Sequence, residues 1–234
     1  MFITFEGGEG AGKTTQAVRL AEHLQSSHYA AQLTREPGGT PLAGAFRALL
    51  LHPDSSVRAL ANAGLASGEE LAEPLLPITE LLLFSAARAQ HVVRIRTWLA
   101  NGNIVVCDRY TDATRAYQGG GRGLDMDAIN NLEHYATEGL KPTVTILLDM
   151  PIEAALHRKQ HVVKQDLTQL SLFETPAWNR LDDETVEFHK RVRAAYREMA
   201  AAEPERWVIL DATQAPDRLA ERVWQVIEPR PPLR

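Results

Sequence analysis

A glycine-rich segment near the N-terminus has the residue types and spacing of a phosphate-binding loop. Residues 7–14 read GGEGAGKT, which fits the spacing G-x-x-x-x-G-K-T. Glycines let the backbone turn tightly, so that successive N–H groups point at nucleotide phosphates, and the positive end of a following helix adds attraction. We expect Lys13 to reach the β- and γ-phosphates of ATP and the Thr14 hydroxyl to hold Mg²⁺. The expected nucleotide-binding residues are Gly7, Gly8, Glu9, Gly10, Ala11, Gly12, Lys13, Thr14 and Thr15.

A second charged pair, Asp108 and Arg109, follows the apolar run NIVVC at residues 103–107. A continuous apolar run is typical of a strand buried on both faces, and open α/β sheets bind their ligands at the carboxyl ends of such strands. A carboxylate there can position Mg²⁺ through water, and Arg109 can bridge the donor γ-phosphate and an acceptor phosphate. The alternative is an ion pair between Asp108 and Arg109 that only caps the strand.

The hydrophobic pattern indicates the elements that must position these residues. A helical pattern follows the glycine-rich loop in residues 17–24, and short apolar runs alternate with further helical patterns. The expected strands cover residues 1–5, 31–34, 103–107, 143–148 and 207–210. The other expected helices cover residues 79–100, 127–138, 151–160, 182–202 and 216–227. This alternation predicts an α/β fold with a parallel sheet covered by helices on both faces.

Composition narrows the class of protein. The chain has 234 residues, enough for one domain or one domain with a small lid, and its net charge is -5. This acidic balance argues against binding to nucleic acid or to an anionic membrane, because both require a basic face. Cys107 is the single cysteine, so no intramolecular disulfide can form. With no apolar run of membrane-spanning length and no basic N-terminal segment, we expect a cytoplasmic protein.

Two stretches interrupt the alternation of strands and helices. Residues 52–77 are rich in Ala, Leu, Ser and Glu and carry no clear motif. Residues 161–179 are polar and have few turn residues, which indicates a mobile loop or a short helix. The proline-rich residues 229–234 are expected to form a frayed C-terminal tail.

Four further motifs separate the kinases from other nucleotide-binding proteins with this loop. They are TREPGGT at residues 34–40, FSAARAQ at residues 84–90, DRY at residues 108–110 and AYQGGGRG at residues 116–123. Together with residues 6–7 and 10–15, this set resembles the thymidylate kinase family, in its bacterial type. The resemblance extends from Met1 to about Thr213, and the joint occurrence of these motifs in this order is highly specific.

The resemblance implies an α/β P-loop nucleoside-monophosphate kinase fold, with a five-stranded parallel sheet and a small lid. It implies one kinase domain at residues 1–228 with a lid at about 157–181, followed by the tail. The implied reaction transfers a phosphoryl group from ATP to dTMP, giving dTDP for dTTP biosynthesis, with Mg²⁺ at Thr14 and Asp108. The family also implies a homodimer.

The resemblance assigns several residues to dTMP. Phe84 and Arg88 are four residues apart and share one helix face, so Phe84 can stack on the thymine while Arg88 donates to its carbonyl group. From spacing alone, plain core packing of Phe84 would be favoured. Thr114 and Tyr117 match positions near the base and sugar, where the tyrosine ring would crowd a 2′-hydroxyl. Arg35 matches the loop beside the acceptor phosphate.

Glu9 is unusual because a carboxylate in a phosphate-binding loop should repel phosphate. Its side chain either points to solvent or, as the family implies, accepts a hydrogen bond from the 3′-hydroxyl of dTMP. The second interpretation is favoured.

The resemblance implies that a lid residue supplies the catalytic arginine, since the phosphate-binding loop itself contains none. The basic residues considered for this role are Arg158, Lys159 and Lys164, with Arg180 further on. Arg158 is the first choice and Arg180 the second. Lys13 and Arg109 are the other expected catalytic residues. Residues 179–182 read NRLD, whereas the family commonly ends its lid in Asp-Arg, an aromatic or aliphatic residue, and Glu. This departure leaves the identity of the lid arginine open.

Two other functions stay open at the level of sequence. The first is a kinase for another nucleoside monophosphate or for a deoxynucleoside, and the latter would need a base such as Glu36 to deprotonate a sugar hydroxyl. The second is a non-catalytic nucleotide-binding switch. A switch would not need Phe84, Arg88 and Tyr117.

Overall fold

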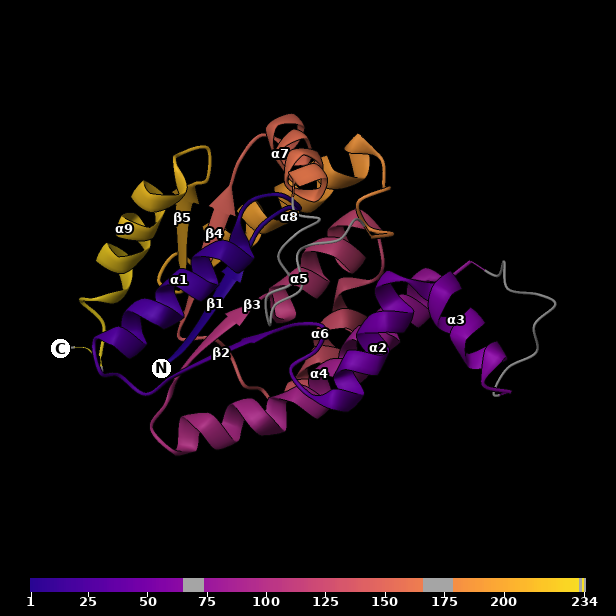
Figure 1. Cartoon of the computed structure of the whole chain (residues 1–234), viewed down its shortest axis with the longest axis horizontal. Helices are drawn as coiled ribbons and strands as arrows, with labels where there is room; N and C mark the ends of the chain where they lie inside the picture. Colours follow the sequence, from indigo (N-terminus) through magenta and orange to yellow (C-terminus); the bar gives the residue numbers. More distant parts are fainter. Residues whose placement is uncertain (65–73, 166–178, 232, 234) are drawn as a thin grey trace.

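The computed structural model describes residues 1–64, 74–165, 179–231 and 233. Its centre is a five-stranded sheet in the order β2-β3-β1-β4-β5, with every neighbouring pair parallel (Figure 1). The strands are β1 (Phe2–Glu6), β2 (Ala31–Arg35), β3 (Ile104–Asp108), β4 (Val144–Asp149) and β5 (Trp207–Asp211). All five expected strands are confirmed, each within one residue at its N-terminal end, and so is the parallel sheet.

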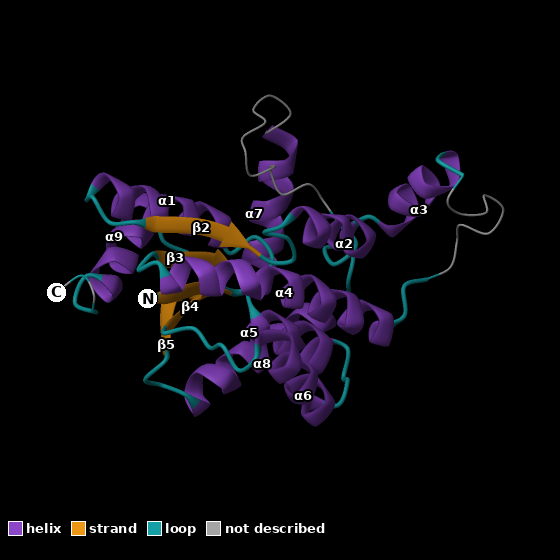
Figure 2. Ribbon diagram, turned by 90° about the horizontal axis from the view of Figure 1, so that it is seen from below, coloured by secondary structure: helices purple, strands orange, loops and turns teal. Residues whose placement is uncertain are grey.

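Helices connect these strands and cover both faces of the sheet (Figure 2). Helices α1 and α9 pack together on one face, while α4 and α8 contact the strands from the other face. The helical elements are α1 (Lys13–Ser26), α2 (Pro41–Leu51), α3 (Pro53–Asn62), α4 (Pro77–Ala100), α5 (Thr111–Thr114), the π-helix η1 (Arg115–Gly121), α6 (Met126–Thr137), α7 (Ile152–Gln165), α8 (Val186–Ala202) and α9 (Pro216–Ile227).

Strand β3 shows how the sheet separates two hydrophobic cores. Ile104 and Val106 lie in the cluster formed with α1 and α9, whereas Val105 and Cys107 lie in a cluster with Ile95 of α4. Successive side chains of a strand point to opposite faces, so a strand that is apolar throughout must be covered on both sides. The continuous apolar run in the sequence is therefore explained by burial, since every residue of β3 is buried.

Several expected boundaries were wrong. Helix α8 begins at Val186, not at residue 182, because the Thr185 hydroxyl caps it by accepting from the backbone N–H of Phe188 at 3.1 Å. Helix α7 continues five residues beyond the expected end at residue 160. Residues 166–178, most of the expected lid loop, lie outside the described residues.

Helices α2 and α3 were missed. Helix α2 has a standard start, in which the Thr40 hydroxyl accepts from the N–H of Ala43 and Pro41 occupies the first turn. Helix α3 occupies the first part of the stretch at residues 52–77 and has no buried residue. In Figure 1 it projects from the main body beyond α2.

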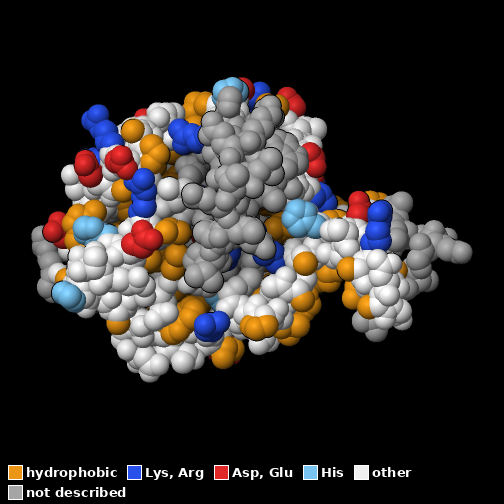
Figure 3. Space-filling model, viewed as in Figure 1, with side chains coloured by type: hydrophobic (Ala, Val, Ile, Leu, Met, Phe, Trp, Pro, Cys, Tyr) orange, Lys and Arg blue, Asp and Glu red, His pale blue; other side chains and the backbone are white. Residues whose placement is uncertain are grey.

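The ends and the surface complete the description. The expected C-terminal tail is not wholly frayed, because Leu233 packs at the edge of the core and its carbonyl accepts from the Tyr29 hydroxyl at 3.4 Å. Acidic and basic side chains are interspersed on the face seen in Figure 3, in keeping with a small net charge. None of the helices in the described part of the chain has the length and hydropathy needed to cross a bilayer.

Candidate active site

A cleft of about 860 Å³ opens at the carboxyl ends of β1, β2 and β3. The phosphate loop, defined as residues 7–15, forms one wall through Glu9, Gly10 and residues 12–15. The opposite wall is formed by five residues from four different segments: Arg35, Phe84, Arg88, Thr114 and Tyr117. Asp108, Arg109 and Arg158 also line the cleft. The structure therefore brings together nearly all of the expected site residues, while Gly7, Gly8 and Ala11 shape the loop from behind.

The phosphate loop is tightly packed against α7. Gly10 has a φ of 73°, and a Cβ at this position would lie 2.0 Å from the carbonyl oxygen of Ala155. Only glycine permits both this left-handed conformation and this close approach. The position of the loop is thus set by helix α7 as well as by β1 and α1.

Lys13 begins α1 and is almost completely buried. Its Nζ donates to the carbonyl oxygen of Gly8 at 2.6 Å, so the ammonium group lies folded over the loop. Burial, with the nearby Arg109 guanidinium adding to it, lowers the pKa of Lys13 to about 8. A buried ammonium with few hydrogen-bond partners is suited to bind an anion.

Thr14 and Asp108 form an oxygen-rich pair across the cleft floor. The Thr14 hydroxyl donates to Asp108 Oδ2 at 2.5 Å. Asp108 Oδ1 is buried and accepts no hydrogen bond from the described residues. Mg²⁺ prefers hard oxygen ligands and keeps several of its waters, so a hydroxyl beside a carboxylate with an unused oxygen fits magnesium.

Glu9 turns into the cleft, away from solvent, and its side chain is only 12% exposed. Its Oε1 accepts from Arg109 Nη2 and, at 2.9 Å, from the Tyr117 hydroxyl. Its Oε2 accepts from Lys159 Nζ at 3.0 Å. The interpretation of Glu9 as a solvent-facing residue is therefore wrong.

Electrostatics keep this carboxylate ionised. Burial alone would raise the pKa of Glu9, but the cations Arg109, Lys159 and Lys13 hold it well below its usual range. Glu9 thus offers fixed hydrogen-bond acceptors beside the cations Arg109, Lys159 and Lys13. Arg109, which has a φ of 69°, stacks its guanidinium over the Tyr117 ring at 4.8 Å.

Glu6 supports Arg109 from below the phosphate loop and was not expected from the sequence. Its Oε1 accepts from the backbone N–H of Tyr110 at 2.7 Å, and its Oε2 accepts from the Tyr196 hydroxyl at 2.7 Å. Burial, and next the nearby Asp112 carboxylate, raise the pKa of Glu6 to about 8. These contacts fix the backbone directly after Arg109, whose Nη1 lies 3.5 Å from the Tyr196 hydroxyl.

Arg88 is the centre of a buried ionic network on the opposite wall. Its Nε donates to Glu36 at 2.6 Å, and its Nη1 donates to Glu133 at 2.6 Å and to Thr114 at 2.9 Å. Its Nη2 donates to the Tyr110 carbonyl at 3.1 Å. Guanidinium has five N–H donors, so the described residues leave one Nη2 hydrogen for a ligand.

Glu36, the base that a deoxynucleoside kinase would need, is fully engaged. Its Oε2 accepts from Arg88, and its Oε1 lies 3.0 Å from His91 Nδ1. Burial would raise its pKa, but Arg88 and His91 outweigh burial and lower it. A carboxylate held by two cationic or polar partners is a structural anchor for Arg88 and a poor candidate for a general base.

Phe84 and Arg35 complete the opposite wall. Phe84 is half-buried, packs partly against the core cluster that contains Tyr117, and lines the cleft. Core packing and ligand contact are therefore compatible for this ring. Arg35 lies at the end of β2, and its buried Nε has no hydrogen-bond partner among the described residues.

Tyr117 is positioned by an unusual helix. It lies in the π-helix η1, a type of helix that is rare and frequent at functional sites. The small residue Gly120 lets α8 pack closely, because a Cβ there would lie 2.6 Å from the Cβ of Ala195. The GGG motif is thus explained by helix packing behind Tyr117.

The two candidate lid arginines differ in their surroundings. Arg158 lies on α7, lines the cleft, and donates to the Ala212 carbonyl at 2.9 Å. Arg180 donates to Glu80 at 2.5 Å and to the Leu50 carbonyl at 3.3 Å, and it does not line the cleft. Arg180 anchors the end of the expected lid segment to α2 and α4.

The link of Glu9 to Lys159 and Asp182 was not expected from the sequence. Lys159 was one of several basic residues near the expected lid, and Asp182 stands where the family commonly has Glu. Their side chains contact each other and join Glu9. The spacing of 150 residues between Glu9 and Lys159 gives no local pattern from which the contact could be predicted.

A phosphate loop at the carboxyl edge of a parallel sheet, facing a second wall of arginine and aromatic residues, defines a P-loop nucleoside-monophosphate kinase fold. Comparison with known protein families identifies the family within this fold, since the thymidylate kinase family model matches residues 5–223. The chain belongs to the thymidylate kinase family.

Individual relatives agree with this assignment. The chain is 46% identical over its whole length to a thymidylate kinase of Synechococcus sp. (strain JA-2-3B'a(2-13)), of which it covers 97%. It is also 46% identical to a thymidylate kinase of Thermomicrobium roseum, over 97% of this chain and 93% of that one. The crystal structure of thymidylate kinase from Ehrlichia chaffeensis matches with a TM-score of 0.65 and 32% identity, over 97% of this chain and 98% of that one.

Family membership confirms the resemblance seen in the sequence, the fold and the class of enzyme. The chain is a phosphotransferase of nucleotide biosynthesis, and the family uses ATP as phosphoryl donor. A non-catalytic switch is no longer supported.

Proposed function

We propose that this chain transfers the γ-phosphoryl group of ATP to the phosphate of dTMP and produces dTDP. The observation that carries the proposal is a single cleft in which a phosphate loop faces Phe84, Arg88, Thr114 and Tyr117. An enzyme that only hydrolyses or senses ATP has no use for the second wall. Family membership supports thymine deoxyribonucleotide as the acceptor.

Lys13 and the N–H groups of the phosphate loop bind the donor phosphates in this proposal. Thr14 and Asp108 would hold Mg²⁺, which, when bound, neutralises phosphate charge. Arg109 lies between the two walls and bridges the donor and acceptor phosphates. These roles use the buried cation Lys13 and the largely buried cation Arg109 to neutralise phosphate charge.

The acceptor needs no general base. The second pKa of a phosphate monoester is about 6, so dTMP is largely dianionic at neutral pH. The obstacle is repulsion between two anionic phosphates. Catalysis therefore consists of positioning and charge neutralisation by Lys13, Arg109 and a lid arginine, for which we propose Arg158.

The opposite wall selects the nucleoside. Phe84 stacks on the thymine, the remaining Nη2 hydrogen of Arg88 donates to a base carbonyl, and Thr114 holds Arg88 in place. The Tyr117 ring crowds a 2′-hydroxyl, and Glu9 accepts from the 3′-hydroxyl. Arg35, whose Nε has no hydrogen-bond partner in the described part of the chain, contacts the acceptor phosphate.

We further propose a lid at residues 157–181, a homodimer and a cytoplasmic location. Support for the dimer comes from α4, where an apolar stripe is exposed on the surface. Its large members, Ile78, Leu82 and Val93, are 52%, 51% and 64% exposed. The stripe consists of Ile78, Leu82, Ala86, Ala89 and Val93.

The proposal is tested by ADP release with Mg-ATP and a panel of acceptors: dTMP, dUMP, ribose TMP, dCMP, dAMP and thymidine. We expect turnover confined to dTMP, with weaker turnover of dUMP. Turnover of thymidine would instead indicate a nucleoside kinase. Binding of ATP without turnover of any acceptor would contradict the proposed reaction.

A further inference from the structure

Lys159 lies at the junction between helix α7 and the phosphate loop. Its side chain is 3% exposed, and its Nζ donates to Glu9 Oε2 at 3.0 Å and to Asp182 Oδ1. Asp182 is itself fixed, because its Oδ2 accepts from the backbone N–H of Asn179 at 2.8 Å. One buried ammonium thus joins α7, the phosphate loop and the segment before α8.

The geometry around Glu9 leaves room for one further donor. A carboxylate has about four lone-pair positions. Among the residues that the structure describes, three donors occupy Glu9: Arg109 and Tyr117 at Oε1, and Lys159 at Oε2. The remaining position at Oε2 is therefore defined by Lys159, which fixes the rotation of the carboxylate about its last bond.

Charge gives Lys159 a second effect. Glu9 and Asp182 are two buried carboxylates that share this ammonium, and Glu9 by itself raises the pKa of Asp182, second to burial. Without the cation the two carboxylates would repel each other. Glu9 would then rotate away from the position in which it can accept a hydrogen bond from a sugar.

We propose that Lys159 is a positioning residue for acceptor specificity, which sets the Glu9 carboxylate so that it accepts from the 3′-hydroxyl of the acceptor nucleotide. The proposal rests on the proposed function of the cleft. Lys159 acts through Glu9, to which its ammonium donates. The acceptor class that it favours is a nucleoside monophosphate with a free 3′-hydroxyl.

The test compares dTMP with 2′,3′-dideoxy-TMP, the analogue without that hydroxyl, in steady-state assays. A hydrogen bond to a charged group changes an equilibrium constant by about ten- to hundredfold. We therefore expect K159Q to lower kcat/KM for dTMP by about that factor. For the analogue, we expect a fall of less than about threefold. The KM of ATP stays nearly unchanged. An equal fall for both acceptors would overturn the proposal, because it would show a general loss of structure.

A double-mutant cycle shows whether Lys159 acts through Glu9. If it does, E9Q combined with K159Q lowers kcat/KM for dTMP no further than the more damaging single substitution. Multiplicative effects would overturn the proposal. K159R keeps a cation beside Glu9 and retains the preference for dTMP over the analogue. Loss of that preference in K159R would also contradict the inference, even if K159Q does not fold.

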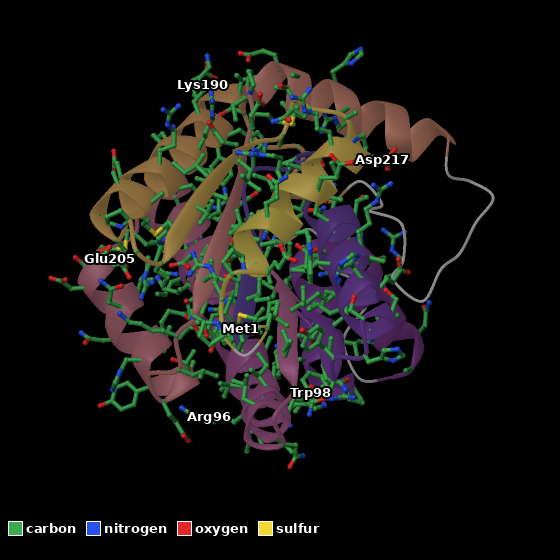
Figure 4. All side chains as sticks on the ribbon, turned by 90° about the vertical axis from the view of Figure 1, so that its left-hand side faces the viewer. Met1, Arg96, Trp98, Lys190, Glu205 and Asp217 are labelled. Atoms are coloured by element: carbon green, nitrogen blue, oxygen red, sulfur yellow. The ribbon has the colours of Figure 1, made fainter. Side chains whose placement is uncertain are left out.

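The matched control is K190Q on α8. Lys190 is exposed and projects outward (Figure 4), so K190Q makes the same change of charge and leaves both acceptors unaffected. Turnover of dTMP by the unmodified protein tests the proposed function separately. Failure of that assay would reject the reaction, whereas normal turnover with unchanged acceptor preference in K159Q would reject only the role of Lys159.

Discussion

The phosphate loop and the opposite wall of the cleft differ in the chemical groups that they present. The loop is one contiguous segment that presents mainly backbone groups, and its shape follows from glycines between a strand and a helix. The opposite wall takes side chains from β2, α4, α5 and η1 and holds Arg88 in place with two buried carboxylates.

This difference separates binding of the donor from recognition of the acceptor. Backbone groups recognise any triphosphate, so the loop gives affinity without selecting a base. Selection of a base requires side chains of fixed orientation. On the opposite wall, buried ion pairs fix the orientation of Arg88. Substitutions in the loop should therefore affect rate, whereas substitutions in the opposite wall should affect specificity and stability together.

The largest expected effect comes from the proposed lid arginine. R158A should lower kcat on the order of 10³-fold and change both KM values little, because an arginine in this role acts mainly in the transition state. R180A is the comparison, since Arg180 contacts Glu80 outside the cleft. Steady-state kinetics decide between them, and a small effect of R158A with a large effect of R180A would reverse the assignment.

Lys13 tests the rate contribution of the phosphate loop. K13M removes the buried ammonium while keeping a chain of similar length, and we expect kcat to fall about 10²- to 10³-fold. The melting temperature should change little, since the Lys13 ammonium donates only to the Gly8 carbonyl among the described residues. Nearly normal turnover would show that the loop binds the donor without helping the transfer.

Arg88 tests whether the opposite wall is also structural. R88M leaves Glu36 and Glu133 buried without their cation, and we expect the free energy of unfolding to fall by about 3–5 kcal/mol. The matched control R218M alters an exposed arginine on α9 and should stay within about 0.5 kcal/mol. Urea unfolding measures both. Equal stability of the two variants would mean that the network is not needed for the fold.

The smallest expected effect, taken per pH unit, is a dependence of stability on pH. The pKa of Glu6 is raised to about 8 in the folded protein from 4.5. Between these values the folded state keeps a proton that the unfolded state has lost, so stability decreases as pH rises, by at most about 1.4 kcal/mol per pH unit. E6Q should remove this slope in urea unfolding between pH 5 and 8. An unchanged slope would show that Glu6 is ionised in the fold.

The same contrast explains what the sequence could reveal. The strands, the phosphate loop and the positions of Asp108 and Arg109 follow from contiguous patterns, and all were predicted. The start of α2 could have been predicted from Thr40 and Pro41, but it was missed. Contacts such as Arg88 with Glu36, or Lys159 with Glu9, depend on how distant elements pack, so no local spacing encodes them.

Glu9 lies in the phosphate loop by sequence but faces the opposite wall by structure, so it tests the central claim most directly. Equilibrium titration of E9Q with dTMP and with ATP, each added alone, separates the two ligands. We predict that dTMP affinity falls about tenfold or more, because one charged hydrogen bond is weakened, while ATP affinity changes little. An equal loss of affinity for both ligands would contradict the assignment of Glu9 to the acceptor.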